Sequence, residues 1–61
     1  MLVTFVLRRA KPGGSREMAV VPRKGEIVHL DGVTYRVRYV VWFTDDEPRE
    51  SDVLVYLRKT W

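Results

Sequence analysis

The 61-residue sequence contains no cysteine, which excludes disulfide bonds, a thiolate nucleophile and a cysteine-ligated zinc ion. Very small domains often depend on such crosslinks, because a chain of this length buries only about 60% of its unfolded surface. A second domain is excluded for the same reason. We therefore expect a single domain over residues 1–61, stabilised by its own apolar core or by self-association.

Long hydrophobic runs are also lacking, and no apolar stretch approaches the roughly 20 residues that a membrane span needs. The apolar start of the chain meets Arg8 and Arg9 too early for a secretory signal. Hydrophobic residues make up 46% of the chain and charged residues 31%, which argues against a disordered or fibrous protein. These observations predict a folded, soluble, cytoplasmic protein with no membrane partner.

No amphipathic helical pattern is visible, and apolar residues recur with a period of two, as in strands. β-branched and aromatic residues dominate these stretches, which favours the same interpretation. The predicted strands are 2–9, 18–21, 26–30, 33–43 and 53–58, joined by a Gly-rich loop at 10–17, a turn at 22–25 and an acidic loop at 44–52. We expect an all-β fold, a small five-stranded antiparallel SH3-like or OB-like barrel, because closure of a sheet removes exposed strand edges.

The strongest local signal is Asp31-Gly32 between two apolar residues, which predicts a two-residue type I′ hairpin. In that register Leu30 pairs with Val33. The partners further along are Val28 with Tyr35 and His29 with Thr34. The core face of this hairpin is then expected to contain Val28, Leu30, Val33, Tyr35, Val37, Tyr39 and Val41. The long strand at 33–43 also predicts a bulge or bend near Tyr39.

Residues 22–37 follow the pattern Pro-x-x-Gly-acid-x-Val-x-Leu-Asp-Gly-x-x-Tyr-x-Val, which continues through Val41-Trp42-Phe43 to an apolar last strand. This pattern resembles small uncharacterised phage and prophage proteins and SH3-like barrels in general, over the greater part of the chain. The resemblance implies a compact β-barrel and an origin in a phage or mobile element. It carries no catalytic residues across, and fold alone does not supply a function.

Residues suited to catalysis are few. The single histidine, His29, has only Ser15 and Ser51 as candidate nucleophiles, and neither serine lies in a nucleophile elbow. The loop at 12–16 lacks the Gly-Lys-Ser/Thr ending of a phosphate-binding loop, and the acids at 45–47 lack the spacing of a calcium loop. We therefore predict that the protein is not an enzyme, that His29 is a surface residue, and that no cofactor or metal is required.

Charge is distributed unevenly along the chain. The net charge is +3, but residues 45–52 hold five acids and one arginine, so the remainder of the chain carries +7. Basic side chains near Trp42 and Tyr56 suit a surface that binds single-stranded nucleic acid or a small anionic ligand. The alternative interpretation is that exposed lysine and arginine keep a small β protein soluble and protect its edges.

Adjacent Trp42 and Phe43 point to opposite faces of a strand, so a single core cannot bury both. Unburied aromatic residues and arginines are typical of interfaces. We therefore predict a non-catalytic binding module, a phage-type accessory or inhibitory protein that docks on a host protein and self-associates. Two alternatives stay open: binding of nucleic acid or an anionic nucleotide by the basic face, and a small structural subunit of an oligomer. The candidate binding residues are Arg23, Lys24, Arg36, Arg38, Trp42, Phe43, Tyr56 and Trp61.

Overall fold

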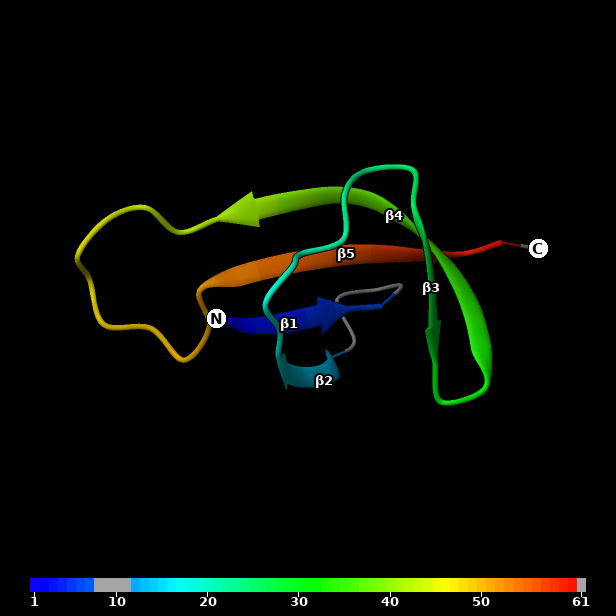
Figure 1. Ribbon diagram of the computed structural model, residues 1–61, viewed down its shortest axis with the longest axis horizontal. Coiled ribbons are helices and arrows are strands. Elements are labelled where there is room, and N and C mark those ends of the chain that lie inside the picture. Colours follow the sequence, from blue (N-terminus) through cyan, green and yellow to red (C-terminus); the bar gives the residue numbers. More distant parts are fainter. Residues whose placement is uncertain (8–11, 61) are drawn as a thin grey trace.

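The computed structural model describes residues 1–7 and 12–60, and all of the regular structure in them is β-strand. The strands are β1 (Leu2–Val6), β2 (Pro12–Glu17), β3 (Ile27–Leu30), β4 (Val33–Trp42) and β5 (Val53–Lys59). They form one sheet in the order β2-β1-β5-β4-β3, which curls into a half-barrel (Figure 1). The prediction of an all-β fold with five strands is confirmed. Within the described ranges there is no helix of the length and apolarity that crossing a membrane requires.

The sheet is mixed, because β1 and β5 run parallel at its centre. The other three neighbouring pairs are antiparallel. The expectation of a wholly antiparallel sheet is therefore wrong for this one pair. Alternating apolar residues report which face of a strand is buried, but they carry no information on the direction of its neighbour.

The position of the second strand also differs from the prediction. Residues 12–17, expected to be loop, form β2 beside β1, whereas residues 18–21, expected to be strand, lie outside any strand. A Cβ atom at Gly13 would lie 3.1 Å from the Leu7 side chain, so the close approach of β2 to this residue favours glycine. The segment 18–21 instead crosses the concave face and buries Val21 in the core. The predicted extension of the first strand to residue 9 falls outside the described residues.

The hairpin between β3 and β4 is confirmed in every pairing. Leu30 lies opposite Val33, and the turn residues Asp31 and Gly32 have φ angles of 51° and 79°. Both values are positive, as a type I′ turn requires. The other confirmed partners are Val28 with Tyr35 and His29 with Thr34.

The predicted bulge is also present, and it changes which residues face the core. The register of β4 against β5 shifts between Val37 and Tyr39, so Arg38 is the extra residue. Beyond it, Val40 packs against the core, while Tyr39 is exposed and stacks on Tyr56. The placement of Tyr39 and Val41 on the core face is therefore wrong, because one inserted residue reverses the alternation.

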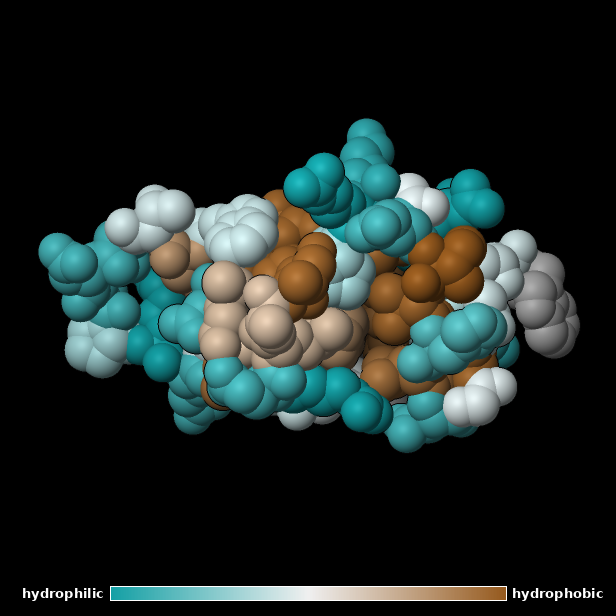
Figure 2. All heavy atoms as spheres, in the orientation of Figure 1, coloured by the Kyte–Doolittle hydropathy of each residue, from teal (hydrophilic) through white to brown (hydrophobic). Residues whose placement is uncertain are grey.

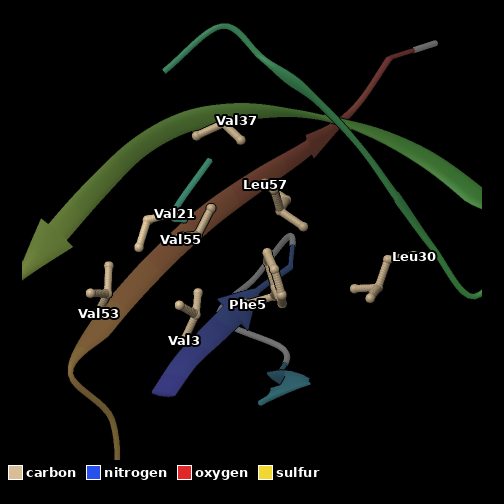
Figure 3. Close-up of a cluster of buried hydrophobic side chains, with 8 residues drawn as sticks. All are labelled: Val3, Phe5, Val21, Leu30, Val37, Val53, Val55 and Leu57. Atoms are coloured by element: carbon tan, nitrogen blue, oxygen red, sulfur yellow. The ribbon is translucent and has the colours of Figure 1, made fainter. Parts of the chain in front are cut away.

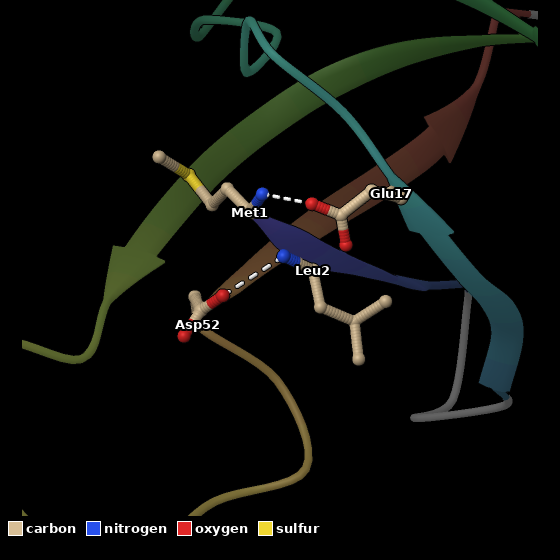
Figure 4. Close-up of polar contacts among 4 residues, drawn as sticks. All are labelled: Met1, Leu2, Glu17 and Asp52. Atoms are coloured by element: carbon tan, nitrogen blue, oxygen red, sulfur yellow. Dashed lines mark hydrogen bonds and ion pairs between the residues drawn. The ribbon is translucent and has the colours of Figure 1, made fainter.

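The core lies on the concave side of the half-barrel and is apolar (Figure 3). Its buried side chains are Val3, Phe5, Val21, Leu30, Val37, Val53, Val55 and Leu57. The start of β1 is held at two points (Figure 4). The Leu2 N–H donates a 2.8 Å hydrogen bond to Asp52 Oδ2, and the Met1 amino group forms an ion pair with Glu17. These contacts tie the loop before β5, and the end of β2, to the first strand.

Candidate binding surfaces

The convex face of β4 and β5 carries a cluster of arginines and tyrosines. We call it the arginine–tyrosine patch and define it as Arg36, Arg38, Tyr39, Tyr56 and Arg58. The buried neighbours of Tyr56 point into the core, so Tyr56 itself points outward. Its ring stacks on that of Tyr39 with 4.4 Å between centroids, and the Arg38 guanidinium carbon lies 5.9 Å from the Tyr39 centroid.

The patch holds positive charge that no acid balances within residues 1–7 and 12–60. Arg36 lies directly opposite Arg58 on the neighbouring strand. Like charges in this arrangement destabilise a sheet by about 0.2–1 kcal/mol. The ion pairs in the described part of the chain join the amino group of Met1 to Glu17 and Arg49 to Asp45, so neither involves the patch. Two arginines in this position, with no ion pair of their own, are suited to an anionic partner.

A second surface is a groove on the concave side, with a volume of about 620 Å³. One wall is the segment 19–24 and the other is the end of β4, with Tyr39, Val40 and Trp42. Trp42 is 53% exposed and Val20 77% exposed. Apolar side chains gather in the middle of this face, where the segment crosses the sheet (Figure 2). Arg23 and Lys24 add positive charge to this apolar groove.

The acidic loop between β4 and β5 is organised around Arg49. Its guanidinium carbon lies 4.3 Å from the centroid of the Phe43 ring, and its Nη2 donates a 2.8 Å hydrogen bond to Asp45 Oδ2. This hydrogen bond, with the charge of Arg49, lowers the pKa of Asp45. The Phe43 N–H donates to the Asp52 carbonyl at 3.1 Å and closes the base of the loop.

His29, Ser15 and Ser51, the residues considered for catalysis, each have a hydrogen-bond partner on a strand. His29 Nδ1 shares a 3.0 Å hydrogen bond with Thr34 Oγ1, across the β3–β4 hairpin. Ser15 and Ser51 both share hydrogen bonds with the Thr4 hydroxyl. In the described ranges, no three His, Cys, Asp or Glu side chains are grouped so that they could hold a metal ion.

The predicted binding residues divide between these sites instead of forming one surface. The patch contains Arg36, Arg38 and Tyr56; the groove contains Arg23, Lys24 and Trp42; Phe43 packs in the acidic loop; and Trp61 lies outside the described residues.

Sequence reasoning missed Tyr39, Arg58 and Val20 as surface features. The position of Tyr39 depends on the bulge, and that of Arg58 on the β4–β5 register, which the alternation alone does not give. For Val20 the sequence held one weak indication of exposure: it lies two residues before Pro22, which ends the predicted second strand.

No family model, curated protein or solved structure matches this chain. The two surfaces are therefore the features of the molecule that point to a function.

Proposed function

We propose that this protein is a non-catalytic binding module that docks on an acidic surface of a partner protein through the arginine–tyrosine patch. One observation carries the proposal: Arg36 and Arg58 lie directly opposite each other, without an acid beside them in the described residues. Carboxylates of a partner would relieve this repulsion and form charge-assisted hydrogen bonds with both guanidinium groups. The stacked Tyr39 and Tyr56 add apolar area beside them, and tyrosine and arginine dominate the binding energy of many interfaces.

We also propose that the half-barrel is of the SH3-like type, with an OB-like barrel as the alternative. The hairpin at 27–36 and the bulged long strand that follows it support this proposal. The resemblance of residues 22–37 to small phage and prophage proteins supports the more specific role of an accessory or inhibitory protein acting on a host protein. In that role the partner is met in the host cytoplasm.

Quantitative capture of partners from a nuclease-treated host lysate tests the docking function. Arg36→Gln/Arg58→Gln should reduce the bound partner at least about tenfold, since hydrogen bonds to charged groups contribute about 1.5–3 kcal/mol each. The control, Arg16→Gln on β2, removes a positive charge outside both surfaces and should leave the yield unchanged. Equal loss in both variants, or no loss in either, contradicts the proposal.

Nucleic-acid binding is the second candidate, because arginines beside exposed aromatic rings also suit a single strand. The acidic loop at 44–52 opposes a long polyanion that follows the molecule, so we rank this candidate lower. We expect affinity for single-stranded DNA weaker than micromolar at physiological salt. If the two arginines contact phosphates, their replacement should reduce the log–log salt slope by up to about 1.4. Micromolar binding that is lost in Arg36→Gln/Arg58→Gln would reverse the ranking.

A further inference from the structure

The second half of β4 lies at an unpaired edge of the sheet. β3 pairs with β4 only through residues 33–36, and Val37 then bonds to the backbone of Gly25 and Glu26. From residue 38 to residue 42, no strand of the described chain pairs with the outer side of β4. The Phe43 N–H points toward β5, where it bonds to Asp52. Alternation therefore directs the backbone N–H and C=O groups of Val40 and Trp42 outward.

Features that usually prevent strand pairing include charged residues, prolines and β-bulges. On this edge they are confined to the bulge at Arg38, and the residues beyond it have none of the three. β2, at one margin of the sheet, contains Pro12 and two charged residues. Residues 39–42 of β4 read Tyr-Val-Val-Trp, with neither charge nor proline. An edge of this composition is suited to pairing with a further strand.

We propose that a second copy of this chain occupies the edge, with the two β4 strands antiparallel about a two-fold axis. Val40 of each copy then lies opposite Trp42 of the other. The outward backbone groups of one β4 strand thereby form hydrogen bonds with those of its counterpart. In this register Val41 lies beside its own counterpart at the axis. The two half-barrels become one continuous sheet.

The groove provides the apolar part of the interface. Val40 and Trp42 point to the concave side, because Val40 packs against the core and Trp42 lies opposite buried Val53. Trp42 of the second copy would therefore lie beside Val40 and enter the groove formed with segment 19–24. This placement removes from water both Trp42 and the exposed Val20, which the isolated chain leaves in solvent.

Charge complementarity selects a second copy as the occupant. Beyond Trp42 of the second copy, the chain continues into its acidic loop and runs toward Arg38, Arg23 and Lys24 of the first copy. In the described part of the chain these three basic residues have no ion pair, and neither have Asp46 and Glu47 of the loop. Glu26 is the acid nearest this turn, and it already accepts a hydrogen bond from the Arg23 N–H. Because the proposed dimer is two-fold symmetric, this acid–base contact occurs twice.

This dimer goes beyond the docking function and does not depend on it. Arg36 and Arg58, which carry the docking proposal, lie where β4 is already paired on both sides, so dimerisation leaves them exposed. Arg38 is the member of the patch that the acidic loop of the second copy would also approach. Loss of the dimer and loss of docking are therefore separate outcomes, tested with different residues.

Charge complementation at the axis tests the proposal. Val41 is half-buried on the convex face, and in the dimer it would face Val41 of the second copy at about 4.5 Å between Cα atoms. Val41→Lys and Val41→Glu should each raise the dimer dissociation constant at least about 100-fold, because like charges at an interface cost several kcal/mol. An equimolar mixture of the two variants should sediment as a dimer again. Ile27→Lys, on exposed β3, is the matched control and should remain dimeric.

Hydrogen exchange on the unmodified protein gives a second test that does not depend on how the variants fold. The amides of Val40 and Trp42 should become protected as concentration rises. Those of Val41 and Phe43, directed toward β5, should be protected throughout. Three results would overturn the proposal: a monomer at millimolar concentration, a dimer whose Val40 and Trp42 amides stay unprotected, or a mixture of Lys and Glu variants that remains monomeric. Dimerisation lost in Ile27→Lys would place the interface on β3 instead.

Discussion

At the scale of single residues, Gly32 in the β3–β4 hairpin has a backbone conformation that residues with a side chain rarely adopt. Its φ angle is 79°, and a Cβ atom there would meet nothing within 4 Å, so only the backbone conformation opposes a side chain. Gly32→Val should therefore lower the free energy of unfolding by about 1–2 kcal/mol, the usual cost of a left-handed L-residue. Urea unfolding measures this loss. Gly32→Asn should lose much less, because asparagine tolerates this region, and equal losses in the two variants would refute the strain explanation.

The second prediction at this scale concerns Asp45. Arg49 lowers its pKa below the ordinary value of 3.8, mainly through their hydrogen bond. Any stability from this pair is present above that ordinary value and is lost as pH falls through the lowered, folded-state pKa. An NMR titration of the Asp45 carboxyl should give a midpoint below 3.8, and Arg49→Gln should raise it. Arg16→Gln, the control, should leave the midpoint unchanged, and an unshifted midpoint in Arg49→Gln would contradict the assignment.

At the scale of elements, the opposed arginines of β4 and β5 predict a conflict between stability and binding. Arg58→Thr removes the like-charge pair with Arg36 and should raise the free energy of unfolding by about 0.2–1 kcal/mol. The same variant should capture less partner protein. Arg16→Thr on β2, which lies opposite Val3, has no repulsion to relieve and serves as the control. Thermal unfolding with parallel capture checks both effects, and an Arg58→Thr protein that is less stable than the control would refute the repulsion argument.

The elements also show which parts of the fold could be predicted from sequence. The Asp31-Gly32 hairpin was predictable because its turn chemistry and register lie within a few residues. β2 was missed because Gly13, Gly14 and Ser15 carry no apolar side chain, and the strand exists through its backbone pairing with β1. Beyond Arg38, the predicted core and solvent faces of β4 were reversed. The bulge was expected at this place, but it moves every later residue of the strand to the opposite face.

At the scale of the whole molecule, the sequence predicted the kinds of binding residue but not how they are grouped. Arg36, Arg38 and Trp42, which were expected to lie on the surface, are exposed, and their role in binding stays a prediction. Their division into a convex patch and a concave groove follows from the curvature of the sheet and from the crossing of segment 19–24. Both depend on contacts between residues far apart in the chain, which alternation within one strand does not report.

Dimerisation makes a prediction for the stability of the whole molecule. If only the folded chain pairs, the melting temperature should rise with protein concentration by mass action. Val41→Lys should abolish this dependence, while Ile27→Lys should retain it. Scanning calorimetry over a hundredfold range of concentration measures the effect. A melting temperature that is independent of concentration in the unmodified protein would contradict the dimer.

The parallel pairing of β1 and β5 has a consequence for how the chain folds. The two central strands come from opposite ends of the sequence, so β1 emerges from the ribosome long before the strand that it must pair with. Until residues 53–59 are made, Val3 and Phe5 lack their main buried neighbours. The β3–β4 hairpin, by contrast, needs only local contacts and can form early. We expect slow folding dominated by one long-range closure, in which residues 53–59 complete the centre of the sheet.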